Sequence, residues 1–431
     1  MSFHSLGLDA QLLRNVEAQG YALTTPIQKK TIPAILEGRD VVGLAQTGTG
    51  KTAAFVLPVL HRLLSGPRRK LRALIVGPTR ELAEQTKDVL LKLGAGTGLR
   101  HVTIYGGVGM QPQINGVRQG ADIAIACPGR LLDLLGQGKF TLDHVECLVL
   151  DEADRMFDMG FLPDIRKILK RLPAGHQTLL FSATMPDEIR KLAHEILRDP
   201  VTVQIAHSKP AETVDHALYP VEQGQKTVLL LELLNTLGDG SVLVFTRTKH
   251  RAKRLAAQLT AAGRRAASLQ GNLSQRQRQA ALDGFKSGRH QILVATDLAA
   301  RGIDVADITH VINLDMPVTV DDYTHRIGRT GRAAKTGDAF TFTTREDEGA
   351  VRAIERLLGF KIERRRLDGF DYSRAPAPQA PPSRPRAQSP RASARKPGGK
   401  PGGKPGGRPG GQGSGRVRSF GSVKAKRRFS R

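Results

Sequence analysis

Short apolar runs alternate with helix-length amphipathic stretches along most of the chain. The first set of runs is Val41–Leu44, Arg72–Val76, His101–Tyr105, Asp122–Ala126, Cys147–Leu150 and Thr178–Phe181, most of them ending near Gly, Pro, Ser or Asp. After about residue 206 the rhythm restarts with Ser241–Phe245, Ala266–Leu269, Gln291–Ala295, His310–Leu314 and Asp338–Phe342. Continuous apolarity within each run indicates parallel strands covered on both faces. The pattern therefore predicts two α/β domains.

The expected boundaries follow from the same rhythm. They are an N-terminal domain over 1–206, a linker over 207–215, a C-terminal domain over 216–370 and a tail over 371–431. In parallel sheets the active groups lie beyond the carboxyl ends of the strands, and the motifs described below fall there. Pro58 lies inside the helix expected after the first strand and is predicted to kink it or to shorten its first segment.

The charge of the chain is concentrated in the tail. The 431 residues include 66 Lys and Arg against 40 Asp and Glu, a net charge of +26. From Arg374 onward there are 16 Lys and Arg and no acid, which leaves 50 basic and 40 acidic residues in 1–373. Pro, Gly, Ser and Arg in this proportion cannot bury a core, so the tail is expected to be disordered. The charge of the whole chain favours a polyanionic partner, either a nucleic acid or an acidic membrane surface. For the tail itself we expect a nonspecific tether to nucleic acid, with RNA and no membrane as the partner; the alternative is a tail that serves solubility alone.

Composition also narrows the location and the redox chemistry. No apolar stretch approaches the roughly 20 residues of a membrane-spanning helix, and the first residues lack the basic start and apolar centre of a signal peptide, so we expect a cytoplasmic protein. The two cysteines, Cys127 and Cys147, predict neither a disulfide framework nor a structural zinc site.

A Gly-rich turn follows the first apolar run and opens a helical segment. Such a turn presents backbone N–H groups to phosphate oxygens at a helix N-terminus. Lys51 would then reach the β- and γ-phosphates, and Thr52 would ligate Mg²⁺. A strict P-loop has Gly where this chain has Ala45, so an ordinary Gly-rich turn is the alternative. The expected nucleotide-binding residues are Ala45, Gln46, Thr47, Gly48, Thr49, Gly50, Lys51 and Thr52.

A second motif follows the run Cys147–Leu150, where the sequence continues as Asp-Glu-Ala-Asp. Asp151 is placed to hold the same magnesium ion, and Glu152 to orient and deprotonate an attacking water. Acidic tetrapeptides alone are more often solvated helix starts. Together with the Gly-rich turn, however, they predict a nucleoside triphosphatase.

The second domain carries an arginine cluster at 325–332, His-Arg-Ile-Gly-Arg-Thr-Gly-Arg. Solvated or phosphate-positioning arginines are the alternative interpretation. In a chain that binds a triphosphate elsewhere, Arg329 and Arg332 are expected to be arginine fingers that make hydrolysis depend on domain closure.

These motifs belong to an ordered series that resembles the DEAD-box RNA helicases of superfamily 2. The series covers nearly all of residues 1–345 and consists of Gly20-Tyr21 with Thr25–Gln28, Ala45–Thr52, Pro78–Leu82, Gly106-Gly107, Pro128–Arg130, Asp151–Asp154, Ser182–Thr184, Val244–Arg247, Gln270–Asn272, Ala295–Asp297 with Arg301–Asp304, and His325–Arg332. Ala45 is the usual residue of that family. The resemblance, closest to the bacterial RhlE-type branch, implies two tandem RecA-like domains that use ATP and Mg²⁺ to unwind RNA locally, with roles in ribosome assembly or RNA decay.

The resemblance also implies roles for individual residues. Gln28 would hydrogen-bond the adenine edge and Phe3 would stack on the base, although ordinary packing is the alternative for Phe3; Asp304 would contact the ribose. His325 joins the catalytic set, while Asp154, Ser182 and Thr184 would connect the ATP site to the domain interface. The implied contacts to the RNA backbone are Thr79, Arg80, Gly107, Gly129 and Arg130 in the first domain, and Arg247, Gly271 and Thr296 in the second.

Two residues depart from the family pattern. Cys127 replaces the usual Thr and loses a hydroxyl donor to a phosphate, at a cost on the order of 1 kcal/mol; a redox-sensing role is the less favoured alternative. Thr24 replaces a Pro in a turn. Two other function classes use related motifs. Gln28 with its flanking signature and His325 count against a processive DEAH or RecQ-like translocase. An ATP-controlled RNA clamp or annealing chaperone stays open, because the same residues would serve it.

Overall fold

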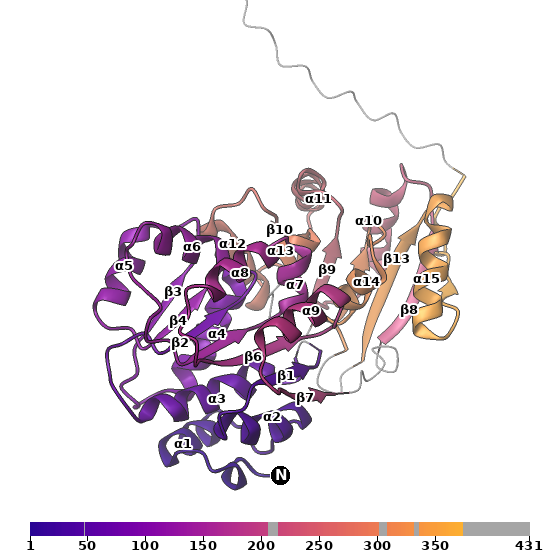
Figure 1. Ribbon diagram of the computed structural model, residues 1–431. Helices are drawn as coiled ribbons and strands as arrows, with labels where there is room; N and C mark the ends of the chain where they lie inside the picture. The colour runs from indigo at the N-terminus through magenta and orange to yellow at the C-terminus, as the bar shows by residue number, and fades with distance from the viewer. Residues whose placement is uncertain (47, 206–213, 301–307, 332–335, 374–431) are drawn as a thin grey trace, which may run out of the picture. The chain divides into compact units, whose positions relative to one another are not determined.

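The computed structural model describes residues 1–46, 48–205, 214–300, 308–331 and 336–373. These residues form two seven-stranded sheets in which every neighbouring pair of strands is parallel, with helices on both faces of each sheet (Figure 1). In the described ranges, no helix combines the length and the apolar character needed to cross a bilayer. Cys127 and Cys147 are both buried and free.

The first sheet has the order β3-β4-β2-β5-β6-β1-β7. Its strands are β1 (Val41–Leu44), β2 (Ala73–Val76), β3 (His101–Ile104), β4 (Ile123–Ala126), β5 (Cys147–Leu150), β6 (Gln177–Ser182) and β7 (Val201–Gln204). One face packs against the 3-10 helix η1 (Phe3–Leu6) and the helices α1 (Ala10–Ala18), α2 (Pro26–Leu36), α3 (Lys51–Leu64) and α4 (Arg80–Leu93). The other packs against α5 (Met110–Arg118), α6 (Pro128–Gly136), α7 (Ala153–Asp158), α8 (Leu162–Leu169) and α9 (Asp187–Ile196).

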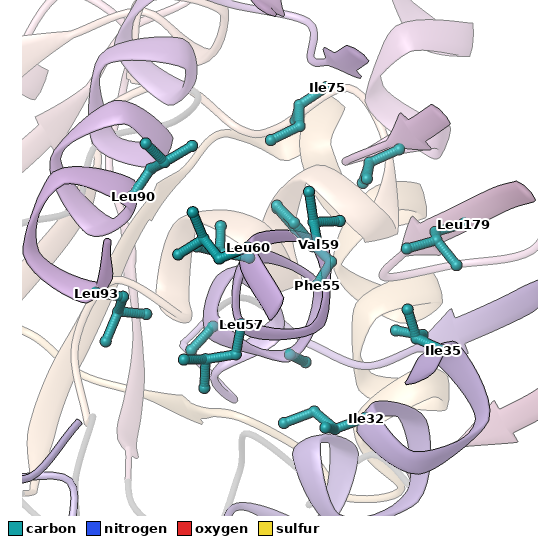
Figure 2. Close-up of a cluster of buried hydrophobic side chains, with 14 of the residues drawn as sticks. Ile32, Ile35, Phe55, Leu57, Val59, Leu60, Ile75, Leu90, Leu93 and Leu179 are labelled. Atoms are coloured by element: carbon teal, nitrogen blue, oxygen red, sulfur yellow. The ribbon is translucent and has the colours of Figure 1, made fainter. Parts of the chain in front are cut away.

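Helix α3 is buried on nearly all sides, which explains its apolar sequence. Its ring Phe55 lies 5.3 Å from the ring of Phe181 on β6, and Gly43 on β1 leaves room for the same ring. Figure 2 shows the side chains of this core, including Phe55, Leu57, Val59 and Leu60 of α3, Ile32 and Ile35 of α2, Leu90 and Leu93 of α4, Ile75 and Leu179. Each such buried side chain contributes about 1.5–3 kcal/mol. The core thereby fixes the start of α3, where the Gly-rich turn ends.

The second sheet has the order β10-β11-β9-β12-β13-β8-β14. Its strands are β8 (Val214–Pro220), β9 (Val242–Phe245), β10 (Ala266–Leu269), β11 (Ile292–Ala295), β12 (His310–Asn313), β13 (Gly337–Thr343) and β14 (Glu363–Arg364). On one face lie α10 (Lys226–Thr236) and α11 (Lys249–Ala261). On the other lie α12 (Gln275–Lys286), α13 (Asp297–Ala300), α14 (Val320–Ile327) and α15 (Glu348–Leu358), the last preceded by the 3-10 helix η2 (Arg345–Asp347).

All eleven apolar runs read from the sequence are strands, with ends that differ by at most one residue. Three strands were not expected: β7, β8 and the two-residue β14. Strand β8 begins at Val214, inside the range expected to be linker. Helix α3 continues through Pro58 to Leu64, so the expected shortening at that proline was wrong: its first segment is not cut short there. The tail from 374 lies outside the described residues.

Candidate active site

The Gly-rich turn joins the carboxyl end of β1 to the first residue of α3. Gly48 and Gly50 have φ values of +88° and +89°, a conformation that glycine adopts without strain. Lys51 is buried, and its Nζ donates a 2.8 Å hydrogen bond to the carbonyl oxygen of Ala45. Thr49 Oγ1 donates to the carbonyl oxygen of Gln46 at 2.7 Å. The turn therefore wraps around the ammonium group at the N-terminus of a 14-residue helix, the arrangement that binds phosphate. Thr47 lies outside the described residues.

Gln28 ties this turn to helix α2. Its Oε1 accepts a 2.9 Å hydrogen bond from Thr25 N in a capping box, and its Nε2 donates to the carbonyl oxygen of Gly50 at 3.1 Å. An amide oxygen has a second lone pair and an amide nitrogen a second hydrogen, so both atoms keep one bonding capacity for a base edge. Gln28 is thus positioned by the same residue that ends the Gly-rich turn.

Phe3 lies inside the core of the first domain. Its side chain is 2% exposed and belongs to the cluster around α3, which favours the packing interpretation over stacking on a base. The ring of Tyr21 stacks on it at a centroid distance of 6.2 Å and is 38% exposed. Tyr21 is therefore the more accessible of the two stacked rings, although sequence reasoning assigned it no role of its own.

Asp151 and Glu152 follow directly after β5. Burial raises the pKa of Asp151 to about 7, while the charge of Lys51 acts in the opposite direction. Lys51 comes from α3 and Asp151 from the end of β5, so the fold brings the two sequence motifs within electrostatic reach. Glu152 has φ +52° and ψ +52°, a left-handed conformation that is strained for a residue with a side chain. Such strain is typical of functional positions.

Asp154 forms the hub of a buried hydrogen-bond network. Its Oδ2 accepts from Thr184 N at 2.9 Å, from Thr184 Oγ1 at 3.1 Å and from Ala183 N at 3.2 Å. Its own backbone N–H donates to Ser182 Oγ at 3.1 Å. Burial opposes the charged form, but Lys51 and the Thr184 N–H outweigh it and lower the pKa of Asp154. The structure thus brings Asp154, Ser182 and Thr184 together.

The RNA-contact candidates of the first domain follow adjacent strands at one edge of the sheet. Thr79 caps α4 by accepting from Leu82 N at 3.2 Å, and the guanidinium of Arg80 packs over Gly107, whose φ is +81°. Gly129 and Arg130 open α6; Gly129 is exposed, and Arg130 Nη1 donates to the carbonyl oxygen of Val108 at 3.2 Å. These residues follow β2, β3 and β4, which neighbour one another in the sheet.

The second domain presents its own candidates in the same way. Arg247, Gly271 and Thr296 follow β9, β10 and β11, which are also adjacent. Arg247 is exposed, and its backbone N–H donates to Asp315 Oδ2 at 2.9 Å. His325 is half-buried on α14, and Arg329 is buried just beyond that helix. Arg332 and Asp304 lie outside the described residues.

Sequence reasoning missed two arginines with defined structural partners. Arg326 is 2% exposed; it binds Asp297 through Nε and Nη2 at 2.5 and 2.7 Å, and its guanidinium lies 5.0 Å from the ring centre of Phe245. Arg155 pairs with Glu152. The ion pair of Arg326 buries charge in a way that a motif cannot reveal, because its ring and carboxylate partners are supplied by other strands and helices.

Comparison with known proteins agrees with this geometry. Residues 25–192 match the family model described as DEAD/DEAH box helicase, and residues 225–334 match the helicase conserved C-terminal domain. A DEAD-box ATP-dependent RNA helicase, CshA, from Geobacillus kaustophilus is 43% identical over 371 residues, which are 86% of this chain and 79% of the relative. The chain belongs to the DEAD-box helicase family.

Solved structures of DEAD-box helicases share the fold. Dbp5 of S. cerevisiae, bound to RNA and ADP BeF3, is 30% identical with a TM-score of 0.77 over 84% of this chain and 95% of that one. Mss116p bound to ssRNA and AMP-PNP is 28% identical with a TM-score of 0.78 over 85% and 78% of the two chains. The expected fold class, two tandem RecA-like domains, is confirmed.

One departure from the DEAD-box pattern has a visible consequence. Cys127 is the N-cap of α6, and its side chain makes no capping hydrogen bond. Burial raises the pKa of its thiol to about 12, so the reactive thiolate is scarce near neutral pH. This environment favours a structural role over redox sensing.

Proposed function

We propose that the protein is an ATP-dependent RNA helicase that locally unwinds or remodels RNA duplexes and RNA–protein complexes. Its two domains close on ATP and single-stranded RNA, and hydrolysis to ADP and phosphate reopens them. The observation that carries this proposal is that Lys51 at the start of α3 and Asp151 after β5, both buried, lie at the same carboxyl edge of the first sheet. The RNA candidates Thr79, Gly107 and Gly129 follow strands of the same sheet.

The donor chemistry of the site fits Mg²⁺. Thr52 offers a hydroxyl oxygen and Asp151 a buried carboxylate, and oxygen ligands of this kind are those that Mg²⁺ prefers. Burial works against the charge on Asp151, and a divalent cation would offset that cost. When bound, the ion neutralises charge on the β- and γ-phosphates.

The residues of the chain divide the remaining work. Glu152 takes the proton of the water whose oxygen attacks the γ-phosphorus, and ADP leaves on the opposite side. Arg329 and Arg332 stabilise the charge of the transition state from the second domain, with His325 beside them. Asp154, through Ser182 and Thr184, links the ATP site to the domain interface; Gln28 and Asp304 select adenine and hold the ribose.

RNA is held through its backbone. Exposed glycines allow backbone N–H groups to approach phosphates, and Arg80, Arg130 and Arg247 supply charge, so binding is insensitive to sequence. We further propose that the protein acts in the cytoplasm. Ribosomal precursors or the RNA-decay machinery are the partners that fit such an activity.

The first test is ATP hydrolysis with and without single-stranded RNA, against matched DNA, in the wild type and in Glu152→Gln. Stimulation by RNA alone is expected. The substitution is expected to lower the stimulated rate about 10²- to 10⁴-fold, the usual contribution of a general base, with ATP binding retained. Equal stimulation by DNA, or a rate indifferent to both, would overturn the proposal.

A second candidate is an ATP-controlled RNA clamp or annealing chaperone. Sixteen basic residues without an acid between 374 and 431 favour it, because such a segment binds any RNA strand. Strand-displacement and annealing assays on the full chain and on residues 1–373 separate the two: a clamp loses annealing with the tail, whereas a helicase core keeps displacement.

The same tail supports the RhlE-type branch as the narrower assignment. This assignment rests on the short core with its Pro- and Gly-rich basic extension. The CshA proteins of Geobacillus kaustophilus and Listeria monocytogenes are 43% and 44% identical to this chain. Removal of residues 374–431 therefore tests the branch assignment through its effect on function.

A further inference from the structure

The first domain has a groove between helices α6 and α8, away from the Gly-rich turn. Its volume is about 570 Å³. It is lined by Gly129, Leu132 and Asp133 from α6 and by Asp164, Lys167, Lys170 and Arg171 from α8 and the residues after it. Gly129 is also one of the proposed RNA contacts, so the groove continues directly from the proposed RNA path.

The charges in this groove are unevenly matched. Asp164 accepts from Lys167 Nζ at 3.1 Å, and Asp133 lies 3.6 Å from Arg130 Nε, so each acid already has a partner on its own helix. Lys170 and Arg171 are exposed, and within the described part of the chain neither side chain pairs with an acid. Two cations therefore face the groove with their charge uncompensated.

An ordinary structural role would account for these cations only in part. Basic residues near a helix C-terminus stabilise it through the helix dipole, by about 0.3–1 kcal/mol. That role places Lys170 at the end of α8, but it does not require a groove or its continuity with Gly129. The aliphatic stems of lysine and arginine can line an apolar wall while their charged ends reach a polyanion.

We propose that this groove binds the phosphodiester backbone of the RNA strand as it leaves Gly129. Lys170 and Arg171 each contact a phosphate, and Leu132 contributes apolar lining. The inference rests on the proposed RNA-helicase function and extends it: the groove lengthens the RNA track on the first domain and gives a longer strand two additional phosphate contacts. No base is read, because the lining offers charge and aliphatic surface.

The test is a double charge reversal, Lys170→Glu with Arg171→Glu, in the full chain. RNA affinity is measured for a short strand that spans only the core contacts and for a longer one, over a range of salt concentrations. Each lost phosphate contact flattens the slope of log affinity against log salt by about 0.7 for a single strand. For the longer strand the slope should therefore become about 1.4 flatter, which corresponds to a loss of about 25-fold in affinity at 0.1 M salt relative to 1 M salt. The affinity for the short strand should be unaffected.

The matched control reverses two exposed lysines of the same domain, Lys70→Glu with Lys92→Glu. Lys92 lies on α4, which covers the opposite face of the sheet, and the change in net charge is the same. RNA-stimulated ATP turnover at saturating RNA and the urea midpoint are followed in all variants, and neither should change in the groove variant.

The outcomes are distinct. If the control variant showed the same flattening of the salt dependence, the effect would be due to net charge and the proposed RNA-binding groove would be overturned. A lower urea midpoint with an unchanged salt dependence of RNA affinity would show that Lys170 and Arg171 only stabilise the end of α8. That result would also overturn the proposal. A wild type without RNA-stimulated turnover would overturn the proposed function itself, whereas a stimulated wild type whose groove variant binds long RNA normally would overturn the groove alone.

Discussion

Arg155 and Glu152 form an ion pair inside the first domain, with Nε and Oε2 3.5 Å apart and side chains only 3% and 5% exposed. Glu152 adopts a left-handed conformation before α7, and Arg155 follows one turn later on that helix. Within the described residues, Glu152 Oε2 and Arg155 Nη2 have no hydrogen-bond partner. The pair is thus held by charge and packing, and it fixes the direction of the carboxylate that we assign as the base.

Replacing Arg155 by Met should therefore affect both stability and turnover. The substitution leaves a buried carboxylate without its countercharge, which typically costs about 3–5 kcal/mol. We expect a lower urea midpoint and a fall of about tenfold in the RNA-stimulated turnover at saturating ATP, since a misplaced base loses part of its contribution. Arg155→Lys should recover part of both. A stable but fully active Arg155→Met protein would show that Glu152 needs no such support.

Thr184 offers a test of the coupling network. In Thr184→Val the hydroxyl bond to Asp154 Oδ2 is lost, while the Thr184 N–H bond remains. The expected loss of stability is about 1 kcal/mol, the usual value of one hydrogen bond. ATP turnover should change little, but strand displacement should fall about tenfold because Asp154 transmits less of the closure. Parallel assays of turnover and displacement decide the matter; equal losses in both would place Thr184 in the hydrolysis step.

Replacing Cys127 by threonine is predicted to improve stability and RNA binding. As the N-cap of α6 it has φ −95° and ψ 141°, the extended conformation in which a threonine hydroxyl can accept from the first turn. We expect Cys127→Thr to add about 1 kcal/mol of stability and to tighten RNA binding about fivefold through a restored hydroxyl donor. Cys127→Val is the control, since it has a similar shape without the hydroxyl. Equal gains in both variants would show that the β-branched shape of the side chain, and not the hydroxyl, is the cause.

The sequence revealed the interior of both sheets because buried parallel strands are continuously apolar. Strand β7 escaped detection because, of its four residues, Val203 alone is fully buried, as expected at a sheet edge. Strand β8 escaped because Asp215 and His216 interrupt its apolar positions. Edge strands such as β7 carry a weak pattern, whereas β8 is an inner strand that its polar residues concealed.

The residues of the candidate site were likewise predictable from the sequence only in part. Lys51, Asp151 and Asp154 were singled out from two motifs because the residues within each motif are close along the chain, although the two motifs lie about 100 residues apart. The partners of Arg326 could not be, since Asp297 lies 29 residues away and Phe245 still further. Ion pairs of this kind are set by which strands become neighbours, and the sequence of one segment does not contain that information.

His216 makes the stability of the second domain depend on pH. Burial lowers its pKa to about 4, against an ordinary 6.5, while the carboxylate of Asp215 acts weakly in the opposite direction. Its Nδ1 is 2.8 Å from the Tyr323 hydroxyl, and the ring of Phe360 packs against it at 5.8 Å. Little room is left to solvate a charged imidazole.

The sign follows from proton binding. Between pH 6.5 and 4 the unfolded chain binds a proton at His216 that the folded domain does not. This contribution to stability is therefore complete above pH 6.5 and is lost as the pH falls towards 4, by about 3 kcal/mol at most. Urea unfolding of the wild type and of His216→Gln at pH 7 and pH 5 measures this. Because carboxylates titrate in the same range, the difference between the two proteins is the decisive quantity: the variant should lose less stability on acidification, and identical losses would remove His216 as the cause.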